Sequence, residues 1–151
     1  MSIETRIAEL GHTLPEVPAP AGSYVNYTRS GNLLFLAGGI PPVEETYQGK
    51  VPTNTSIETA QEAARLVTLN RLAVVKDAVG SLDKVKQIVT VNGFVNSEPD
   101  FYSHPAVING CSDLLVEIFG DKGMHSRTAC GVAALPLNVS VEINMVVEVE
   151  N

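Results

Sequence analysis

The chain has 151 residues, 44% hydrophobic and 18% charged, a composition typical of one globular domain over residues 1–151 and not of a disordered protein. The formal net charge of −7 argues against a nucleic-acid partner, because phosphate backbones are bound by clustered Lys and Arg. The sequence contains no apolar run as long as a membrane span, and its charged start, MSIETRIAEL, is unlike a signal peptide, so we expect no membrane partner and a cytoplasmic location.

The first third of the chain predicts a short helix followed by a hairpin. Residues 2–11 place apolar side chains at helical spacing, and Ser2 is a suitable N-cap. Residues 13–23 contain three prolines and predict an extended lead-in. Strands are expected over 24–29 and 33–38, because two apolar runs flank a glycine-containing turn.

The middle of the chain predicts two helices with a strand between them. Apolar side chains keep helical spacing from Asn54 or Thr55 to about Ala78, where Gly80 would end the helix. Residues 85–95 alternate as a strand does, and residues 105–119 predict the second helix. The charged residues of the long helix are interpreted as a solvated face: Glu58, Glu62, Arg65 and Arg71.

The last part of the chain predicts two strands, over residues 127–134 and 139–149, joined by the turn Leu135-Pro136-Leu137-Asn138. The predicted order is therefore a short N-terminal helix followed by β-β-α-β-α-β-β. Helices that alternate with strands in this way indicate an α+β fold, with a mixed sheet and two helices packed on one face.

If these two strands form a hairpin, opposite residues have numbers that sum to 273. Cys130 then lies opposite Ile143 on the core side, while Arg127 and Glu142 share the other face, over Ala129 and Gly131. An arginine fork suits a carboxylate, and a nearby glutamate can hold or activate a water. The alternative is an exposed cross-strand ion pair without function.

The stretch HSRTACGVAALPLNVSVEINMVVEV resembles the C-terminal signature of the RidA (YjgF) family of reactive-intermediate (imine) deaminases. Leu135-Pro136 begins eight residues after Arg127, and Glu142 follows fifteen residues after it, which is the family's spacing. The segments GNLLFLAGGIPP and AGSYVNYTRSGN resemble the family's second strand and its lead-in, with Tyr24 at the aromatic position.

This resemblance implies a chorismate-mutase-like fold assembled as a homotrimer with clefts between subunits. In such a cleft Arg127 grips the carboxylate of a small metabolite, and Glu142 positions water that hydrolyses a 2-imino acid to a 2-oxo acid and ammonia. Tyr24 lines the cleft from a neighbouring subunit. The resemblance implies no metal and no organic cofactor.

Other positions fill out this predicted site. Five residues are expected to line the substrate: Tyr24, Ala37, Gly38, Asn109 and Ala129. Ala37 and Ala129 depart from the family, which often has Ser or Thr at the first and Cys at the second, so the chain falls in a divergent subgroup. His125 is interpreted as a packing or capping histidine, with assistance in proton transfer as the alternative. His12 and His104 lack metal-ligand spacing.

The leading functional hypothesis is hydrolysis of 2-imino or enamine acids. The alternative is a trimer that binds a carboxylate metabolite without catalysis, and the two differ in whether Glu142 must act as an acid or base. The ribonuclease activity ascribed to some relatives fits poorly with a charge of −7. A chorismate-mutase-type reaction rests on the expected fold alone.

Overall fold

A computed structural model describes residues 1–151. It contains three α-helices, five strands and four short 3-10 turns. The helices are α1 (Ile3–Glu9), α2 (Ile57–Val79) and α3 (His104–Phe119). The strands are β1 (Tyr27–Ser30), β2 (Leu33–Leu36), β3 (Val85–Asn96), β4 (Ser126–Val132) and β5 (Val141–Val149), and the 3-10 turns are Glu45–Tyr47, Leu82–Lys84, Gly120–Gly123 and Pro136–Asn138.

Helix ends are set by capping side chains that the sequence offers. The Ser2 hydroxyl accepts a hydrogen bond from the backbone N–H of Thr5, which confirms it as the N-cap of α1. Ser56 accepts from the N–H of Thr59, so α2 begins two to three residues later than the pattern suggested. Gly80 ends α2 with φ 88°, a left-handed conformation that glycine adopts without strain.

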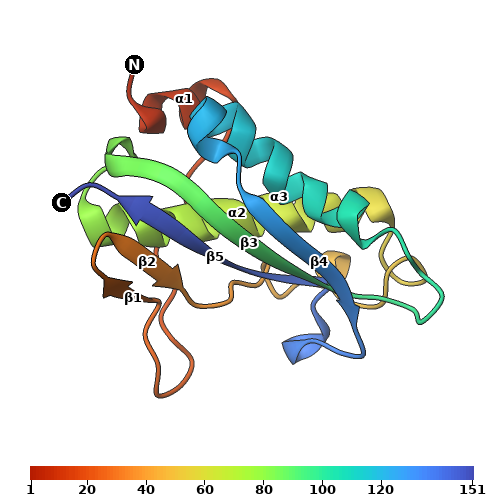
Figure 1. Cartoon of the computed structure of the whole chain (residues 1–151). Coiled ribbons are helices and arrows are strands. Elements are labelled where there is room, and N and C mark those ends of the chain that lie inside the picture. The colour runs from red at the N-terminus through yellow and green to blue at the C-terminus, as the bar shows by residue number, and fades with distance from the viewer.

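The five strands form one mixed sheet in the order β1-β2-β5-β3-β4. Strand β5 pairs antiparallel with both β2 and β3 and so occupies the centre of the sheet. Strand β4 pairs parallel with β3, and α3 makes the crossover between them, as Figure 1 shows. The outer side of β4 is therefore an edge of the sheet.

Helices α2 and α3 cover one face of this sheet (Figure 1). In β5 every odd-numbered residue from Val141 to Val149 is buried, whereas the even-numbered ones remain partly accessible on the opposite, uncovered face. Buried alanines on α2, including Ala60 and Ala64, allow close approach to the neighbouring elements. The structure confirms the predicted α+β class, the order of the elements and the one-sided covering by helices.

The predicted hairpin between the last two strands is wrong. Strands β4 and β5 do not pair, because β3 lies between them. Arg127 is aligned with Val91, and Glu142 is aligned with Phe94, so the two residues project from opposite faces of the sheet. The exposed cross-strand pair considered as the alternative is excluded within one chain by the same register.

The predicted orientation of Cys130 is also wrong. Cys130 is aligned with Phe94 and hence lies on the uncovered face, half-buried, rather than in the core. Cys111, on α3, is fully buried as expected, and burial raises the pKa of its thiol to about 11. Cys111 is therefore a poor nucleophile at neutral pH.

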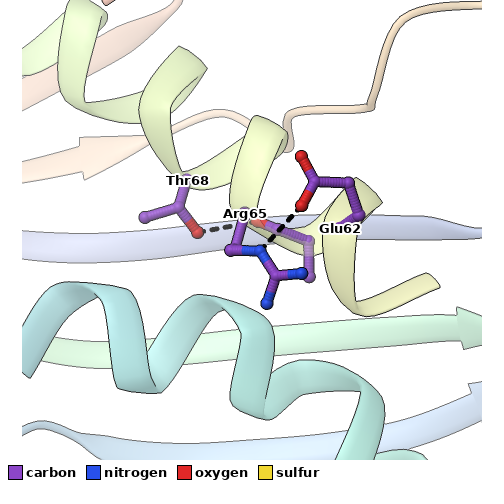
Figure 2. A network of polar contacts seen from close by, with 4 residues as sticks. Glu62, Arg65 and Thr68 are labelled. Carbon is purple, nitrogen blue, oxygen red and sulfur yellow. Dashed lines mark hydrogen bonds and ion pairs between the residues drawn. The ribbon is translucent and has the colours of Figure 1, made fainter. Parts of the chain in front are cut away.

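The charged residues of α2 are solvated except for Arg71. Figure 2 shows the Glu62–Arg65 ion pair, with 2.8 Å between Glu62 Oε2 and Arg65 Nε, beside the Thr68 hydroxyl that donates to the Ala64 carbonyl oxygen. Both members of the pair are partly exposed, so its contribution to stability is small. Arg71, interpreted as part of the same face, is instead 2% exposed.

None of the helices combines the length and the apolar character that crossing a membrane would require.

Gly110 brings α3 into direct contact with the backbone of α2, because a Cβ at this position would collide with the carbonyl oxygen of Gln61. Gly110→Ala should therefore lower the free energy of unfolding by about 1–2 kcal/mol, since overpacking outweighs the helix propensity gained. Urea unfolding monitored by circular dichroism measures this. Gly22→Ala is the control, because its Cβ would make an ordinary contact with the Tyr24 ring at 3.5 Å. Equal stability of both variants would contradict the packing.

Candidate functional site

Arg127 lies on the helix-covered face of the sheet, at the edge formed by β4. Its Nη1 donates to Asn109 Oδ1 at 2.7 Å and to Ser112 Oγ at 3.2 Å, and both acceptors belong to α3. The Nε and Nη2 groups make no hydrogen bond within the chain. The guanidinium is therefore anchored at one nitrogen and presents its other N–H groups to a ligand.

His125, two residues before Arg127, extends the same network. Its Nε2 lies 2.8 Å from Ser112 Oγ, and its Nδ1 lies 2.6 Å from the carbonyl oxygen of Gly123. We call Asn109, Ser112, His125 and Arg127 the Arg127 cluster. It borders a cavity of about 600 Å³, whose lining comprises Ser112, Asp113, Val116, Glu117, Met124, His125 and Arg127.

Glu142 lies on the uncovered face of the sheet, near the start of the central strand β5. Its carboxylate packs over the backbone of Gly38, where an added Cβ would lie 2.5 Å from Oε2. Glycine at position 38 leaves the space that this approach uses. Gly38, which was expected to line the substrate, thus lies beside Glu142 within one chain, whereas Arg127 does not.

Arg71 is the member of this second group that the sequence interpretation missed. Its guanidinium donates from Nη1 to the Ala37 carbonyl oxygen at 2.7 Å, and from Nε and Nη2 to Asn70 Oδ1. It fills the space beside Gly39, whose hypothetical Cβ would lie 2.5 Å from Arg71 Nε. The available signal was its position in the apolar repeat of α2, where an arginine needs a buried partner.

Tyr24 completes this group. Together with Gly38, Gly39, Asn70 and Arg71 it borders a cavity of about 180 Å³ beneath the proline-rich lead-in. We call Tyr24, Gly38, Arg71 and Glu142 the Glu142 cluster. Ala37 contributes its carbonyl oxygen to this cluster, through Arg71, rather than a side-chain group.

The charges of the Glu142 cluster influence one another. Burial raises the pKa of the Glu142 carboxyl above its ordinary value, and the positive charge of Arg71 acts in the opposite direction. Burial lowers the pKa of the Arg71 guanidinium, while Tyr24 and Glu142 act to raise it. The cluster thus holds a carboxyl group that takes up a proton more readily than an exposed glutamate.

The predicted site residues therefore divide into two places. Asn109 and Ala129 lie with Arg127, since Ala129 is aligned with Gly93 and shares the helix-covered face. Tyr24, Ala37 and Gly38 lie with Glu142. Two strand spacings, about 10 Å, separate β4 from β5. The sheet itself lies between Arg127, on its helix-covered face, and Glu142, on its uncovered face.

No group of three or more His, Cys, Asp or Glu side chains comes together in a way that could hold a metal ion. The groups available for chemistry are the hydroxyl, imidazole and guanidinium of the Arg127 cluster and the carboxyl and guanidinium of the Glu142 cluster. They can bind an anion and exchange protons.

Comparison with known proteins assigns the chain and its fold to one family. The family model described as "YjgF/chorismate_mutase-like, putative endoribonuclease" matches residues 4–149. The chain belongs to this family, which is the RidA (YjgF) family whose signature its C-terminal segment resembles.

Individual relatives cover nearly the whole chain. Protein TCP17 of Trypanosoma cruzi is 38% identical over 99% of this chain and 95% of its own length. A 2-iminobutanoate/2-iminopropanoate deaminase of Dermatophagoides farinae is 31% identical over 90% of this chain and 93% of its own. The crystal structure of a "putative endoribonuclease" from Shewanella oneidensis MR-1 superposes with a TM-score of 0.94, at 35% identity over 99% of this chain and 100% of that one.

The raised pKa of Glu142 has a consequence for stability. A carboxyl group whose pKa is higher in the folded than in the unfolded state destabilises the fold progressively as pH rises above the ordinary value of 4.5. Glu142→Gln should therefore be more stable than the wild type at pH 7, and the difference should shrink as the pH falls toward that value. Urea midpoints at several pH values measure it.

Glu148→Gln is the matched control, because Glu148 lies on the same face of β5 but makes no approach to Gly38 or Arg71. A Glu142→Gln variant that is less stable than wild type at pH 7, with a deficit that grows with pH, would mean that attraction to Arg71 outweighs burial.

Proposed function

We propose that this protein hydrolyses reactive 2-imino acids to 2-oxo acids and ammonia, in clefts between the subunits of a homotrimer. The observation that carries this proposal is the Arg127 guanidinium, anchored by Asn109 and Ser112 through one nitrogen and free at the other two, beside an open cavity. Such a guanidinium suits the carboxylate of a small organic acid. Similarity to a protein named 2-iminobutanoate/2-iminopropanoate deaminase supports the reaction.

The separation of the two clusters supports a site shared between subunits. Within one chain Arg127 and Glu142 project from opposite faces of the sheet, so they cannot act on the same small molecule. A neighbouring copy that brings its uncovered face against the β4 edge would place its Glu142 cluster near Arg127. Each cleft would then take Arg127 from one subunit and Glu142 with Tyr24 from the next.

The uncovered face of the sheet has the character of an interface. Phe35 is 45% exposed there, and Phe94 and Val146 are only half-buried on the same side. The outer edge of β4 offers unpaired backbone groups beside it. Association of copies of the chain through these surfaces would bury both the apolar side chains and the open edge.

In such a cleft each cluster has a distinct chemical task. Arg127 binds the carboxylate of the imino acid and thereby fixes the adjacent imine carbon. The Glu142 carboxylate of the neighbouring subunit accepts a hydrogen bond from a water and holds it for attack on that carbon. Its raised pKa suits a group that must both take up and return a proton.

Binding without catalysis is the second candidate function. It is favoured by Ala37 and Ala129, which present no side-chain hydroxyl or thiol to a ligand. A ribonuclease activity, to which the family's description refers, is opposed by the net charge of −7.

Substitution of Arg127 tests the proposal. Arg127→Ala should weaken the binding of small 2-oxo acids, measured by isothermal titration, by roughly 30- to 1000-fold, because a charge-assisted bidentate contact is lost. Arg127→Lys should restore part of this affinity, since a point charge cannot reproduce the planar fork. Ammonia release from 2-imino acids generated in situ by an amino acid oxidase should fall in parallel.

Glu142→Gln distinguishes imine hydrolysis from binding without catalysis. The amide keeps the shape but cannot accept a proton, so kcat should fall while the affinity for 2-oxo acids changes little. If wild-type protein binds 2-oxo acids but hydrolyses no imine, the binding function replaces the enzymatic one. If Arg127→Ala binds 2-oxo acids as tightly as wild type, the site lies elsewhere.

A further inference from the structure

We infer that Ser112 is a catalytic residue of the Arg127 site, and that it transfers protons between the bound ligand and His125. This inference rests on the proposed function, because it assigns proton transfers in imine hydrolysis. The observation behind it is a continuous chain of hydrogen bonds from Arg127 through Ser112 to His125, along the cavity beside Arg127.

The chemistry of the partners fixes the direction of each hydrogen bond. The carbonyl oxygen of Gly123 can only accept, so His125 Nδ1, 2.6 Å away, carries a proton and donates it. In a neutral imidazole the other nitrogen, Nε2, is then an acceptor, and the Ser112 hydroxyl donates to it across 2.8 Å. Arg127 Nη1 can only donate, and Ser112 Oγ accepts from it.

Ser112 is thus held between a proton acceptor and a positive charge. The imidazole is ready to take the hydroxyl proton, while the guanidinium stabilises negative charge that develops on the oxygen. His125 is oriented by Gly123 in the way that a third group orients the base of a catalytic pair. A merely structural histidine needs neither this tautomer nor an arginine on its partner.

Ser97 and His104 form a second serine–histidine pair, at the other end of α3, with 3.1 Å between Ser97 Oγ and His104 Nε2. The His104 ring packs edge-on against Phe101, with 5.4 Å between ring centroids. No hydrogen bond joins this pair to a cation. His104 is therefore a packed histidine, whereas His125 is linked through Ser112 to Arg127.

The cavity brings a ligand to the pair. Ser112, His125 and Arg127 all line it, so a carboxylate held by Arg127 places the adjacent carbon and nitrogen near the Ser112 hydroxyl. The other charged groups that line the cavity are Asp113 and Glu117, both exposed. Glu142 of the same chain cannot reach this cavity, because it projects from the other face of the sheet.

The proton transfers balance as follows. Water attacks the carbon of the protonated imine, a C–O bond forms, and the C=N π electrons move onto nitrogen. Ser112 takes one proton of that water while passing its own to His125. The return transfer protonates the nitrogen, and the C–N bond breaks with its electron pair on ammonia. As the C=O bond forms, the neighbouring subunit's carboxylate takes the remaining hydroxyl proton and gives it to ammonia, which leaves as ammonium.

The test is a pH profile of imine hydrolysis by the full-length protein and its variants. In the wild type, kcat/KM should fall at acid pH, because only a neutral imidazole accepts the Ser112 proton and only an ionised Glu142 carboxylate accepts a hydrogen bond from the attacking water. Ser112→Ala and His125→Gln should lower kcat by roughly 100-fold or more and lose the part of this acid limb that depends on the imidazole, while the part that depends on Glu142 remains. Ser112→Thr, which keeps the hydroxyl, should retain both the rate and the limb.

The affinity for a 2-oxo acid distinguishes a catalytic role of Ser112 from a role in positioning Arg127. The affinity of Ser112→Ala for a 2-oxo acid should change by no more than about tenfold, the effect of one hydrogen bond, so the loss falls on kcat rather than on KM. His104→Gln is the matched control and should leave the profile unchanged.

The outcomes separate this inference from the proposed function. If the wild type hydrolyses imines but Ser112→Ala and His125→Gln keep its rate and its acid limb, the proton transfer assigned to them is overturned while the reaction stands. If the wild type hydrolyses no imine, the proposed reaction and this assignment fail together. A loss in the two variants that appears wholly in ligand affinity would make them supports for Arg127 and would also overturn the catalytic role.

Discussion

The parallel pairing of β3 with β4 is the constraint on which the rest of the molecule depends. A parallel neighbour requires a crossover, and α3 supplies it over the face that α2 also covers. The crossover places β4 at the edge of the sheet and leaves the centre to β5. The direction in which every functional side chain of the last two strands projects follows from this one pairing.

Two chemically different sites result from that arrangement. At the edge, α3 lies beside β4, and its polar side chains Asn109 and Ser112 anchor Arg127 next to an open cavity. At the centre, β5 passes beside the end of β2, where Gly38 admits the Glu142 carboxylate and Arg71 lies buried behind it. One cluster presents free guanidinium N–H groups, and the other holds a carboxyl group whose pKa is raised by burial. The proposed hydrolysis of a carboxylate-bearing imine uses both.

The local spacing of apolar residues predicted the helices and strands well. It did not indicate which distant strands pair with one another. The apolar spacing of α2 and α3 and the alternation of β5 specify those elements directly, and Ser2 is an N-cap as predicted. The loop Leu135–Asn138 was compatible with a hairpin, and nothing local indicated that β3 would lie between the strands it joins. The same error placed Cys130 in the core. Arg71 was misassigned because its partner, the Ala37 carbonyl oxygen, is 34 residues away.

Complementation between inactive variants tests most directly whether the site is shared between subunits. Arg127→Ala and Glu142→Gln chains, mixed in equal amounts by co-refolding, should form trimers in which about one quarter of the clefts join an intact Arg127 to an intact Glu142 of the next subunit. The account predicts that about a quarter of wild-type imine hydrolysis returns on mixing. Mixed trimers, verified by light scattering and two affinity tags, with no more activity than the separate variants would contradict it.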